Sequence, residues 1–449
     1  MKKWRCRICG YIHTGENPPF QCPVCQAGAE DFKPMEDFFS SAAGSAIKKI
    51  IIIGNGAAGM EAARTLRENN SEVEILLFSD ENYPFYSRIH LSSFLADDSS
   101  IEKITIYPKN WYEENRITVV LNTRVVEINS DKQIVIDKHG VSYPYDRLII
   151  ATGASSFVPP IKGIDKKGVS LLRTLEHALQ IREKMDKFSS AIIIGGGILG
   201  IEVASSLHKA GKKVTIIELS DRLMPQQLDS DGSKILSHIL EARGISVITS
   251  TRIDEIFGNT QVDGILLSSG EKLAAQFIIL ATGIVPNIAL ARQAGINVHR
   301  GIIVNERLET SRKNIYAAGD VAEFQNTTYG IWPAAVDQGY AAALNALGIT
   351  YHYRGTTPLH ILKVAGLEVT TIGKKYPDQS GEEQIVYRNP EAGEYVKLIH
   401  NREYIQGALV LGVKGISYRL EKMIKKNVTA RHIIGDLASG KWEMLRKSS

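Results

Sequence analysis

The feature that most restricts the fold is a glycine motif that occurs twice. The two copies, IIIIGNGAAGMEAA and AIIIGGGILGIEVA, share their glycine spacing and lie 141 residues apart. A β-branched run precedes each set of glycines, as expected of a parallel strand that is buried on both faces. The first glycine permits a tight turn, the second lets a pyrophosphate approach the backbone, and the third lets a helix pack closely on the strand. The repeat therefore predicts two Rossmann-like dinucleotide-binding folds in one chain.

Acidic residues follow both motifs at about the distance expected of a ribose ligand. The strand of the second copy ends at Glu218, where a carboxylate favours NADH over NADPH because it repels a 2′-phosphate. Arg222 is close enough to weaken that preference. In the first copy the strand ends at Ser79, so the ribose contact falls to Asp80 or Glu81. The alternative for each acid is an ordinary solvated loop charge.

All four cysteines lie near the amino terminus, in two CxxC pairs, Cys6 with Cys9 and Cys22 with Cys25. Two such turns facing each other supply the tetrahedral sulfur cage that suits iron or zinc. Two disulfides are the alternative, but structural disulfides are rare in a chain without a secretory signal. Fewer than about 40 residues seldom bury enough apolar surface to fold alone, so we expect the ion to supply much of the folding energy.

Composition and charge argue against several classes of partner. Lysine plus arginine exceeds aspartate plus glutamate by only 4, with the signs interleaved, so we expect no nucleic-acid partner. The start, MKKWRCRICG, lacks the apolar core of a signal peptide. The longest apolar stretch, near 191–201, is rich in glycine and meets Glu202, so no membrane segment is predicted. These features predict a cytoplasmic protein.

The motifs follow a fixed order along residues 47–449. LIIATG at 148–153 and IILATG at 278–283 each close a predicted dinucleotide fold, and IYAAGD follows at 315–320. This order resembles that of the FAD-dependent pyridine nucleotide-disulfide oxidoreductases. Two further stretches, YPFYSRIHLSSFLA and DRLMPQQLD, resemble the flavin module of assimilatory nitrite reductases and the NADH:rubredoxin reductases.

The amino-terminal segment resembles a second family. CRICGY followed by CPVC is similar to rubredoxin, most closely to the short-spaced domain of rubrerythrins. Gly10 matches the glycine that this family has after the second cysteine of each pair. Gln26 stands at the equivalent place of the second pair, where a non-glycine residue is strained if the backbone dihedral φ must be positive.

The two resemblances imply an α/β protein with two Rossmann-like domains, a rubredoxin-like metal domain before them and an α+β domain after them. The implied boundaries are a metal domain at 1–38, a linker at 39–46, a discontinuous FAD-binding domain at 47–155 and 281–350, an NAD-binding domain at 156–280 and a carboxyl-terminal domain at 351–449.

The resemblance also assigns residues to each cofactor. The backbone near Val126 would meet the adenine, Arg88 would lie beside the flavin or its pyrophosphate, and Asp320 would hydrogen-bond the ribityl-pyrophosphate region. Trp332 and Pro333 would open a helix aimed at the flavin N1/O2 edge. The residues assigned to FAD are Gly54, Gly56, Ala58, Gly59, Asp80, Glu81, Arg88, Val126, Ala151, Thr152, Gly153, Gly319 and Asp320.

The second glycine motif is assigned to NADH, with NADPH possible. Glu202 would lie near the nicotinamide carboxamide, with Gly283 close by. The residues assigned to the nicotinamide cofactor are Gly195, Gly197, Leu199, Gly200, Glu202, Glu218 and Gly283. We assign no general acid or base, because hydride transfer needs placement of the cofactors more than proton transfer.

The resemblance predicts where the electrons go. Relatives that reduce disulfides or peroxides carry cysteines beside the flavin, but 60–66 and 83–96 contain none. The leading hypothesis is therefore an NADH-dependent FAD oxidoreductase that reduces its own four-cysteine iron site and then an external redox protein, such as a rubrerythrin or a flavo-diiron protein. One alternative is a flavin reductase or oxidase with a zinc docking knuckle. Another is an FAD- and NAD-binding sensor. We expect a monomer or a homodimer.

Overall fold

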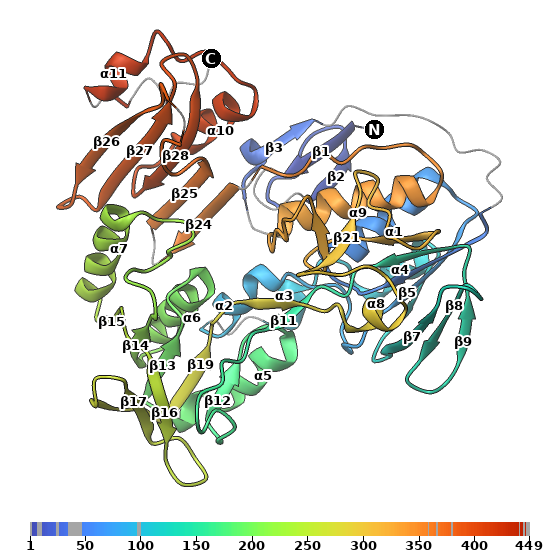
Figure 1. The fold of residues 1–449 in the computed structure, drawn as a ribbon, viewed down its shortest axis with the longest axis horizontal. Helices are drawn as coiled ribbons and strands as arrows, with labels where there is room; N and C mark the ends of the chain where they lie inside the picture. Colours follow the sequence, from blue (N-terminus) through green and yellow to red (C-terminus); the bar gives the residue numbers. More distant parts are fainter. Residues whose placement is uncertain are drawn as a thin grey trace. The chain divides into compact units, whose positions relative to one another are not determined.

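A computed structural model describes most of the chain, in two compact units (Figure 1). The described residues are 2–6, 11–23, 27–34, 47–96, 100–357, 359–364, 367–378, 380–439, 441–442 and 445. The first unit gathers Met1–His90, Ser99–Ser155 and Ile284–Thr356, and the second gathers Leu91–Asp98, Ser156–Gly283 and Thr357–Ser449. The predicted linker at 39–46 lies outside the described residues.

A five-stranded parallel sheet forms the centre of the first unit, in the order β22-β10-β4-β5-β6. Its strands are β4 (Lys49–Ile53), β5 (Glu74–Phe78), β6 (Ile117–Val120), β10 (Arg147–Ile150) and β22 (Ile315–Ala317). The central strand β4 is fully buried at Ile50, Ile51 and Ile52, as its continuous apolar run predicts.

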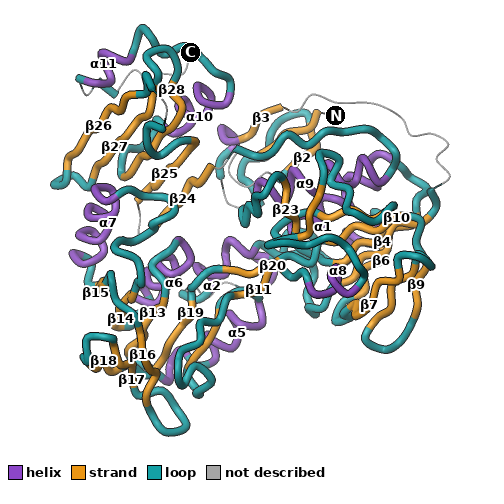
Figure 2. Tube along the Cα trace, viewed as in Figure 1, coloured by secondary structure: helices purple, strands orange, loops and turns teal. Residues whose placement is uncertain are grey.

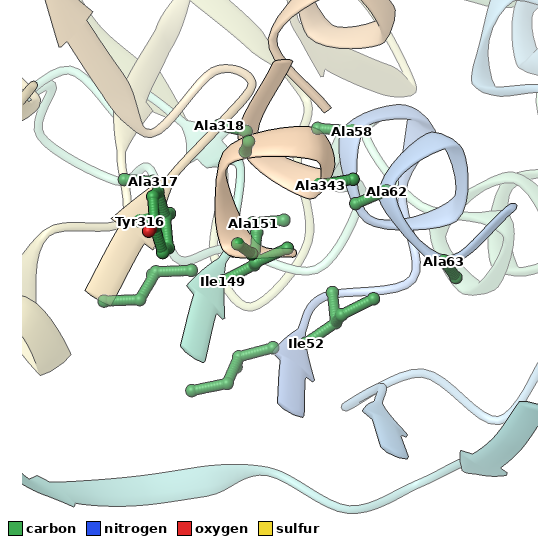
Figure 3. Close-up of a cluster of buried hydrophobic side chains, with 14 of the residues drawn as sticks. Ile52, Ala58, Ala62, Ala63, Ile149, Ala151, Tyr316, Ala317, Ala318 and Ala343 are labelled. Carbon is green, nitrogen blue, oxygen red and sulfur yellow. The ribbon is translucent and has the colours of Figure 1, made fainter. Parts of the chain in front are cut away.

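Two helices that are far apart in sequence pack together in this unit. They are α1 (Ala57–Asn69) and α9 (Trp332–Ala346), and Figure 3 shows Ala62 of α1 beside Ala343 of α9. Small side chains let the backbones come close: a Cβ at Gly339 would lie 2.3 Å from the carbonyl oxygen of Ala58. The segment that follows the second Rossmann-like fold in sequence therefore completes the first fold, through close backbone contact between α9 and α1.

Shorter elements complete the first unit. The three-stranded antiparallel sheet β7-β8-β9 and the pairs β11-β20 and β21-β23 accompany short helices. They are β7 (Val125–Asn129), β8 (Ile134–Asp137), β9 (Ser142–Pro144), β11 (Ala154–Ser156), β20 (Ile284–Pro286), β21 (Ile302–Val304), β23 (Ala322–Phe324), η2 (Arg88–His90), α3 (Ile101–Ile104), α4 (Lys109–Glu114) and α8 (Ala289–Gln293).

The second unit repeats this plan. Its parallel sheet has the order β12-β19-β13-β14-β15 and is accompanied by an antiparallel sheet, β16-β17-β18. The elements are β12 (Val169–Leu171), β13 (Ser190–Ile194), β14 (Lys213–Ile217), β15 (Ile245–Ile248), β16 (Ile253–Phe257), β17 (Gly264–Leu267), β18 (Lys272–Ala274), β19 (Phe277–Leu280), α2 (Leu91–Phe94), α5 (Leu175–Glu183), η3 (Met185–Lys187), α6 (Ile198–Lys209) and α7 (Ser230–Ala242).

The two copies of the fold share a β-bulge at the same place in their antiparallel sheets. The ladder of β7 with β8 shifts register between Val125 and Glu127, and that of β16 with β17 shifts between Ile253 and Glu255. Both antiparallel sheets thus carry a bulge at the second residue of their first strand. The two predicted Rossmann-like folds are confirmed as an internal repeat.

A five-stranded antiparallel sheet with two helices forms the carboxyl-terminal part of the second unit (Figure 2). Its elements are β24 (Leu359–Val364), β25 (Leu367–Gly373), β26 (Glu383–Asn389), β27 (Glu394–His400), β28 (Ile405–Leu411), α10 (Ser417–Lys425) and α11 (Ile434–Ala438). Buried Asp229, the N-cap of α7, accepts hydrogen bonds from Tyr395 Oη at 2.7 Å and Lys397 Nζ at 3.0 Å. The predicted α+β class of this part is confirmed.

The amino-terminal segment forms a small antiparallel sheet of its own. The order is β2-β1-β3, with β1 (Lys2–Cys6) paired to both β2 (Ile12–Gly15) and β3 (Phe32–Pro34), and η1 (Ala29–Asp31) precedes β3. We call residues 2–34 the small module. Along the described part of the whole chain, every helix is too short or too polar to span a bilayer.

The α1–α9 packing yields a stability prediction. Gly339→Ala should destabilise the protein by about 1–3 kcal/mol, because the added methyl group meets backbone that has no room to move. Gly435→Ala in α11 is the control: no described atom lies within 4 Å of that Cβ position, so a gain of up to about 1 kcal/mol is expected. Thermal unfolding followed by circular dichroism compares the two, and equal midpoints would contradict the close-packing account.

Candidate cofactor and metal sites

The first glycine loop brings a helix start against a strand end. Gly54 follows β4 with φ at +120°, and its carbonyl oxygen lies 1.8 Å from where a Cβ would sit at Gly59. Gly56 caps α1, and no described atom lies within 4 Å of its Cβ position. Buried Ala58 follows in the first turn. The amides at the start of α1 therefore face open space, which fits a pyrophosphate.

The second glycine loop has the same geometry. Gly195 has φ at +113°, a Cβ at Gly200 would lie 1.9 Å from its carbonyl oxygen, and Gly197 caps α6 with open space beside it. Leu199 is half-buried in the first turn of α6. Both loops thus satisfy the same steric requirement for a dinucleotide.

Glu218 is fixed at the end of β14. Its carboxylate is nearly buried and accepts hydrogen bonds from the backbone nitrogens of Gly196 and Ser220, each at 2.7 Å. The carboxylate therefore lies directly beside the glycine loop, where a ribose hydroxyl would reach it. Arg222 forms an ion pair with its neighbour Asp221 at 2.7 Å, so its guanidinium points toward the carboxylate of Asp221.

The two candidate acids of the first copy differ in their surroundings. Asp80 is exposed in the turn after β5. Glu81 accepts a hydrogen bond from Tyr86 Oη at 2.6 Å and forms an ion pair with Arg88. Burial tends to lower the pKa of Arg88, but Tyr86 and Glu81 outweigh it, so this pKa is raised. Glu81 therefore positions Arg88, and Asp80 is the acid oriented to solvent.

Val126 occupies the bulge of β7, and 46% of its surface is exposed. The bulge removes this residue from the cross-strand ladder with β8. Its backbone is thereby left available at the sheet edge, as a contact with an adenine ring requires.

The two ATG segments are each anchored by a connecting strand. Thr152 Oγ1 donates to the carbonyl of Asn287 at 3.2 Å, and Asn287 returns hydrogen bonds to the carbonyls of Thr152 at 2.8 Å and Gly153 at 2.9 Å. In the second copy, Phe157 receives a bond from Thr282 Oγ1 at 2.7 Å and donates to Gly283 at 2.9 Å. Ala151, buried just before Thr152, supplies the carbonyl that Gly54 approaches.

The AAGD segment meets both α1 and α9. Gly319 has φ at +83°, and its nitrogen donates to Gln338 Oε1 at 2.8 Å. A Cβ at Gly319 would lie 2.9 Å from that of Ala58, so this segment borders the first glycine loop. Asp320 follows directly and is close enough to Arg88 to contribute to its raised pKa. The structure thus brings the FAD-assigned residues of three distant segments to one edge of the sheet.

Glu202 lies in α6, and Ser92 Oγ donates to its Oε2 at 3.0 Å. Burial raises the pKa of Glu202 to about 7, although the Ser92 hydrogen bond acts in the opposite direction. This carboxyl group therefore takes up a proton near neutral pH. Its place on the helix that begins at the second glycine loop is the one the motif predicts.

The small module holds the candidate metal ligands. Cys6 and Cys22 are each 1% exposed, and their backbone nitrogens bond the carbonyls of Tyr11 at 2.7 Å and Ala27 at 2.8 Å. Both bonds join residues five positions apart, so the first cysteine of each pair is held in the same way, which fits a thiolate cage. Cys9 and Cys25 lie outside the described residues, together with Gly10 and Gln26.

Several residues of the site were not predicted from the sequence. Asn55, between the first two glycines, accepts a hydrogen bond from Tyr112 Oη at 3.2 Å and donates to the carbonyl of Tyr83 at 3.4 Å, in the segment that leads to Arg88. Ser92, Asn287 and Gln338 hold Glu202, Thr152 and Gly319, respectively. Only Asn287 had a local signal, as the asparagine of the ATGxxPN motif.

The raised pKa of Glu202 yields a pH prediction. The neutral carboxyl is favoured by burial, so its contribution to stability is complete below pH 4.5 and is lost as the pH rises toward about 7. Glu202→Gln should flatten the pH dependence of the thermal midpoint over this interval. Ser92→Ala should move the loss to higher pH, because the hydroxyl stabilises the charged form. Parallel curves for all three proteins would contradict this assignment.

Comparison with known proteins agrees with this arrangement. The family model described as pyridine nucleotide-disulphide oxidoreductase matches residues 48–339. Models of the rubredoxin-like domain of rubrerythrin and of the carboxyl-terminal domain of rubredoxin NAD+ reductase match residues 4–33 and 358–428.

Individual relatives are similar over most of the chain. The assimilatory nitrate reductase electron transfer subunit of Bacillus subtilis is 36% identical over 399 residues, which are 88% of this chain and 52% of that protein. The chain thus spans about half the length of this relative. The NADH-rubredoxin oxidoreductase of Clostridium acetobutylicum is 32% identical over 376 residues, which are 84% of this chain and 94% of that protein.

Solved structures show the same likeness. The crystal structure of the Clostridium acetobutylicum NADH:rubredoxin oxidoreductase has a TM-score of 0.74 at 30% identity, covering 87% of this chain and 98% of that one. A putidaredoxin reductase in covalent complex with putidaredoxin has a TM-score of 0.77 at 26% identity, covering 85% of this chain and 94% of that one. With its two glycine loops and its small module, the chain belongs to the pyridine nucleotide-disulphide oxidoreductase family, in the branch of the NADH:rubredoxin reductases and nitrite reductase flavin modules, and carries a rubredoxin-like domain at its amino terminus.

Proposed function

We propose that the chain is an NADH-dependent flavoprotein that reduces its own rubredoxin-like iron site. The first glycine loop holds FAD and the second holds NADH. The open space beside Gly56 and Gly197 supports this assignment, because a diphosphate can reach the helix amides there. When bound, the flavin accepts a hydride from the nicotinamide and supplies electrons for one-electron transfer.

The residues of the first unit hold and polarise this cofactor. Arg88, kept in place by Glu81, supplies a cation near Asp320. Pro333 pre-sets the first turn of α9, and the helix start directs amide dipoles at the place where negative charge gathers on reduction. Glu202 and Glu218 position the nicotinamide cofactor in the second unit.

The observation that carries the proposal is the placement of the cysteines. All four are in the small module, and no cysteine follows Cys25 anywhere in the chain. The body therefore has no thiol acceptor, whereas the module buries Cys6 and Cys22 within the same compact unit as the first glycine loop. Relatives named for rubredoxin reduction support an iron–thiolate acceptor.

The external acceptor follows from electron counting. NADH supplies two electrons and a four-thiolate iron takes one at a time, so a one-electron redox protein must reoxidise the module twice for each NADH. A rubrerythrin or a flavo-diiron protein is the proposed class. Phe20 of the module, 93% exposed, offers an apolar contact for such a partner.

Anaerobic titration with NADH tests the relay. Flavin absorbance should bleach together with the iron–thiolate absorbance, and Cys22→Ser should abolish the second signal while flavin reduction continues. Metal analysis of natively purified protein should give one iron per chain. One zinc per chain, or flavin reduction without loss of the iron–thiolate band, would overturn the relay and leave a flavin reductase with a zinc docking knuckle.

Nucleotide preference provides a second test. Glu218→Ala should raise the KM for NADH by about tenfold, because charge-assisted hydrogen bonds to the ribose are lost. The KM for NADPH should fall, because the repelling carboxylate is gone. Steady-state assays with a ferricyanide acceptor measure both constants, and Asp221→Asn is the matched control that keeps Glu218. Equal changes for the two nucleotides would argue against this role.

A further inference from the structure

The small module contacts the first Rossmann-like fold through two pairs of opposite charge. Lys3 Nζ lies 2.8 Å from Glu68 Oε2 of α1, and Arg5 forms an ion pair with Asp337 of α9. The four side chains are only 22–28% exposed, so both pairs are partly shielded from water. Removing one partner of such a pair costs more than in a fully exposed pair, because a shielded charge is left without its counterion.

The strand β1 presents both cations on one face. Lys3 and Arg5 are two residues apart, and side chains at that spacing point to the same side of a strand. Trp4, between them, donates from Nε1 to the carbonyl of Gly15 within the module at 3.1 Å. Because β1 is the central strand of the module sheet, its neighbours fix the orientation of this basic face.

The receiving surface is acidic for a structural reason. On α1, buried Arg64 donates to both Glu61 and Glu68, so one guanidinium is shared by two carboxylates. Lys3 supplies a further cation to Glu68. On α9, Asp337 also accepts from Thr356 Oγ1 at 2.7 Å. The outer face of the two helices therefore offers carboxylates that are held in position and that match Lys3 and Arg5.

Apolar contacts accompany the charges. Cys6, Cys22, Ala27 and Phe32 of the module belong to the same buried cluster as the core of the first fold. Trp4 and Tyr11 pack against that cluster from partly buried positions. Buried apolar residues of the module are therefore continuous with the core of the first fold.

Two chains of contacts lead from this surface to the predicted flavin site. Asp337 continues through Thr356 and Tyr353 to Gln338, which holds Gly319 of the AAGD segment.

The second chain is aromatic. Trp332 stacks on Phe85 at 5.7 Å between ring centroids, and Phe85 lies 5.9 Å from Tyr107. Tyr107 and Tyr11 of the module both pack against the buried cluster of the first fold.

We infer that the outer face of α1 and α9 is the docking surface for this chain's own small module, held by Lys3 and Arg5, and that the metal thiolates exchange electrons with the flavin from this position. The inference rests on the proposed function for its second half only. Docking is intramolecular, so a tether that gives about millimolar effective concentration makes two shielded ion pairs and an apolar contact sufficient.

The electron count is balanced in this arrangement. Each NADH delivers two electrons to the flavin, and the docked ferric site accepts one in each of two transfers. After each transfer a one-electron redox protein takes that electron from the module. Two such rounds of transfer and reoxidation account for both electrons of one NADH.

Carboxyl footprinting of the full, cofactor-loaded protein tests the docking directly. Amidation of Asp337 by a carbodiimide, read by peptide mass spectrometry, should be about tenfold faster in Arg5→Asp than in the unsubstituted chain, since one partly buried pair is broken. About 1 M salt should have a smaller effect, because partly buried pairs in contact are screened much less than exposed charges. Lys3→Glu should expose Glu68 in the same way, independently of Arg5.

Matched variants separate docking from charge alone. Arg252→Asp reverses an equivalent charge in an exposed pair with Asp254 in the second unit, and it should leave Asp337 labelling unchanged. Loss of docking in Arg5→Asp should also speed the labelling of Glu68, and the exchange Arg5→Asp with Asp337→Arg should restore slow labelling of Glu68. Equal labelling of Asp337 in the unsubstituted chain and Arg5→Asp would overturn the docking.

Kinetics test the second half. In Arg5→Asp, NADH should reduce the flavin at the normal rate, whereas bleaching of the iron–thiolate band should be about tenfold slower. Unchanged bleaching with faster Asp337 labelling would overturn the assignment of this surface as the place of electron exchange. Protection of Asp337 without any bleaching in the unsubstituted chain would refute the relay and leave the docking intact.

Discussion

The arrangement of both cofactor sites depends on one steric fact, the absence of a side chain where a helix starts against a strand end. The carbonyl oxygens of Gly54 and Gly195 lie within 2 Å of the positions that Cβ atoms would take at Gly59 and Gly200. Any larger residue there would push the helix away from the sheet. Because the helices are close, their first amides face the carboxyl edge of the sheet in each unit. The first ATG segment and AAGD lie at that edge in the first unit, and the second ATG segment and Glu218 in the second. The sites are thus assembled largely from backbone, and side chains refine them.

Much of the fold was predictable because its signals are local. Continuous β-branched runs identified β4 and β13, and the glycine spacing identified α1 and α6. Elements of three residues such as β11 and β20 carry no periodicity, and their existence depends on a pairing between segments far apart in sequence. The bulges at Val126 and Asp254 could not be predicted from the sequence either, because a bulge depends on how the opposing strand pairs.

In the candidate site, too, residues in local motifs could be predicted and contacts between distant residues could not. Glu218 was identified from its distance to the glycine motif, and the structure places it beside that motif. The sequence alone leaves the choice between Asp80 and Glu81 open, because only the positions of Tyr86 and Arg88 in the fold show that Glu81 is already engaged. Pairs such as Ser92 with Glu202 join residues 110 positions apart, so no local pattern predicts them. The geometry of the glycine loops could therefore be predicted from the motif, whereas the contacts around them could not.

The discontinuity of the first unit has a consequence for biosynthesis. The edge strand β22 and the helix α9 complete the first sheet and its helix layer, but they are translated after the whole of Ser156–Gly283. On the ribosome, the second Rossmann-like fold can therefore form before the first one is complete. During that time β10 lacks one of its two neighbouring strands, and the side of α1 at Ala58 is uncovered. Chaperones that recognise unpaired strand edges would meet this nascent chain during that interval. The first Rossmann-like fold thus becomes complete only after the second one has been translated.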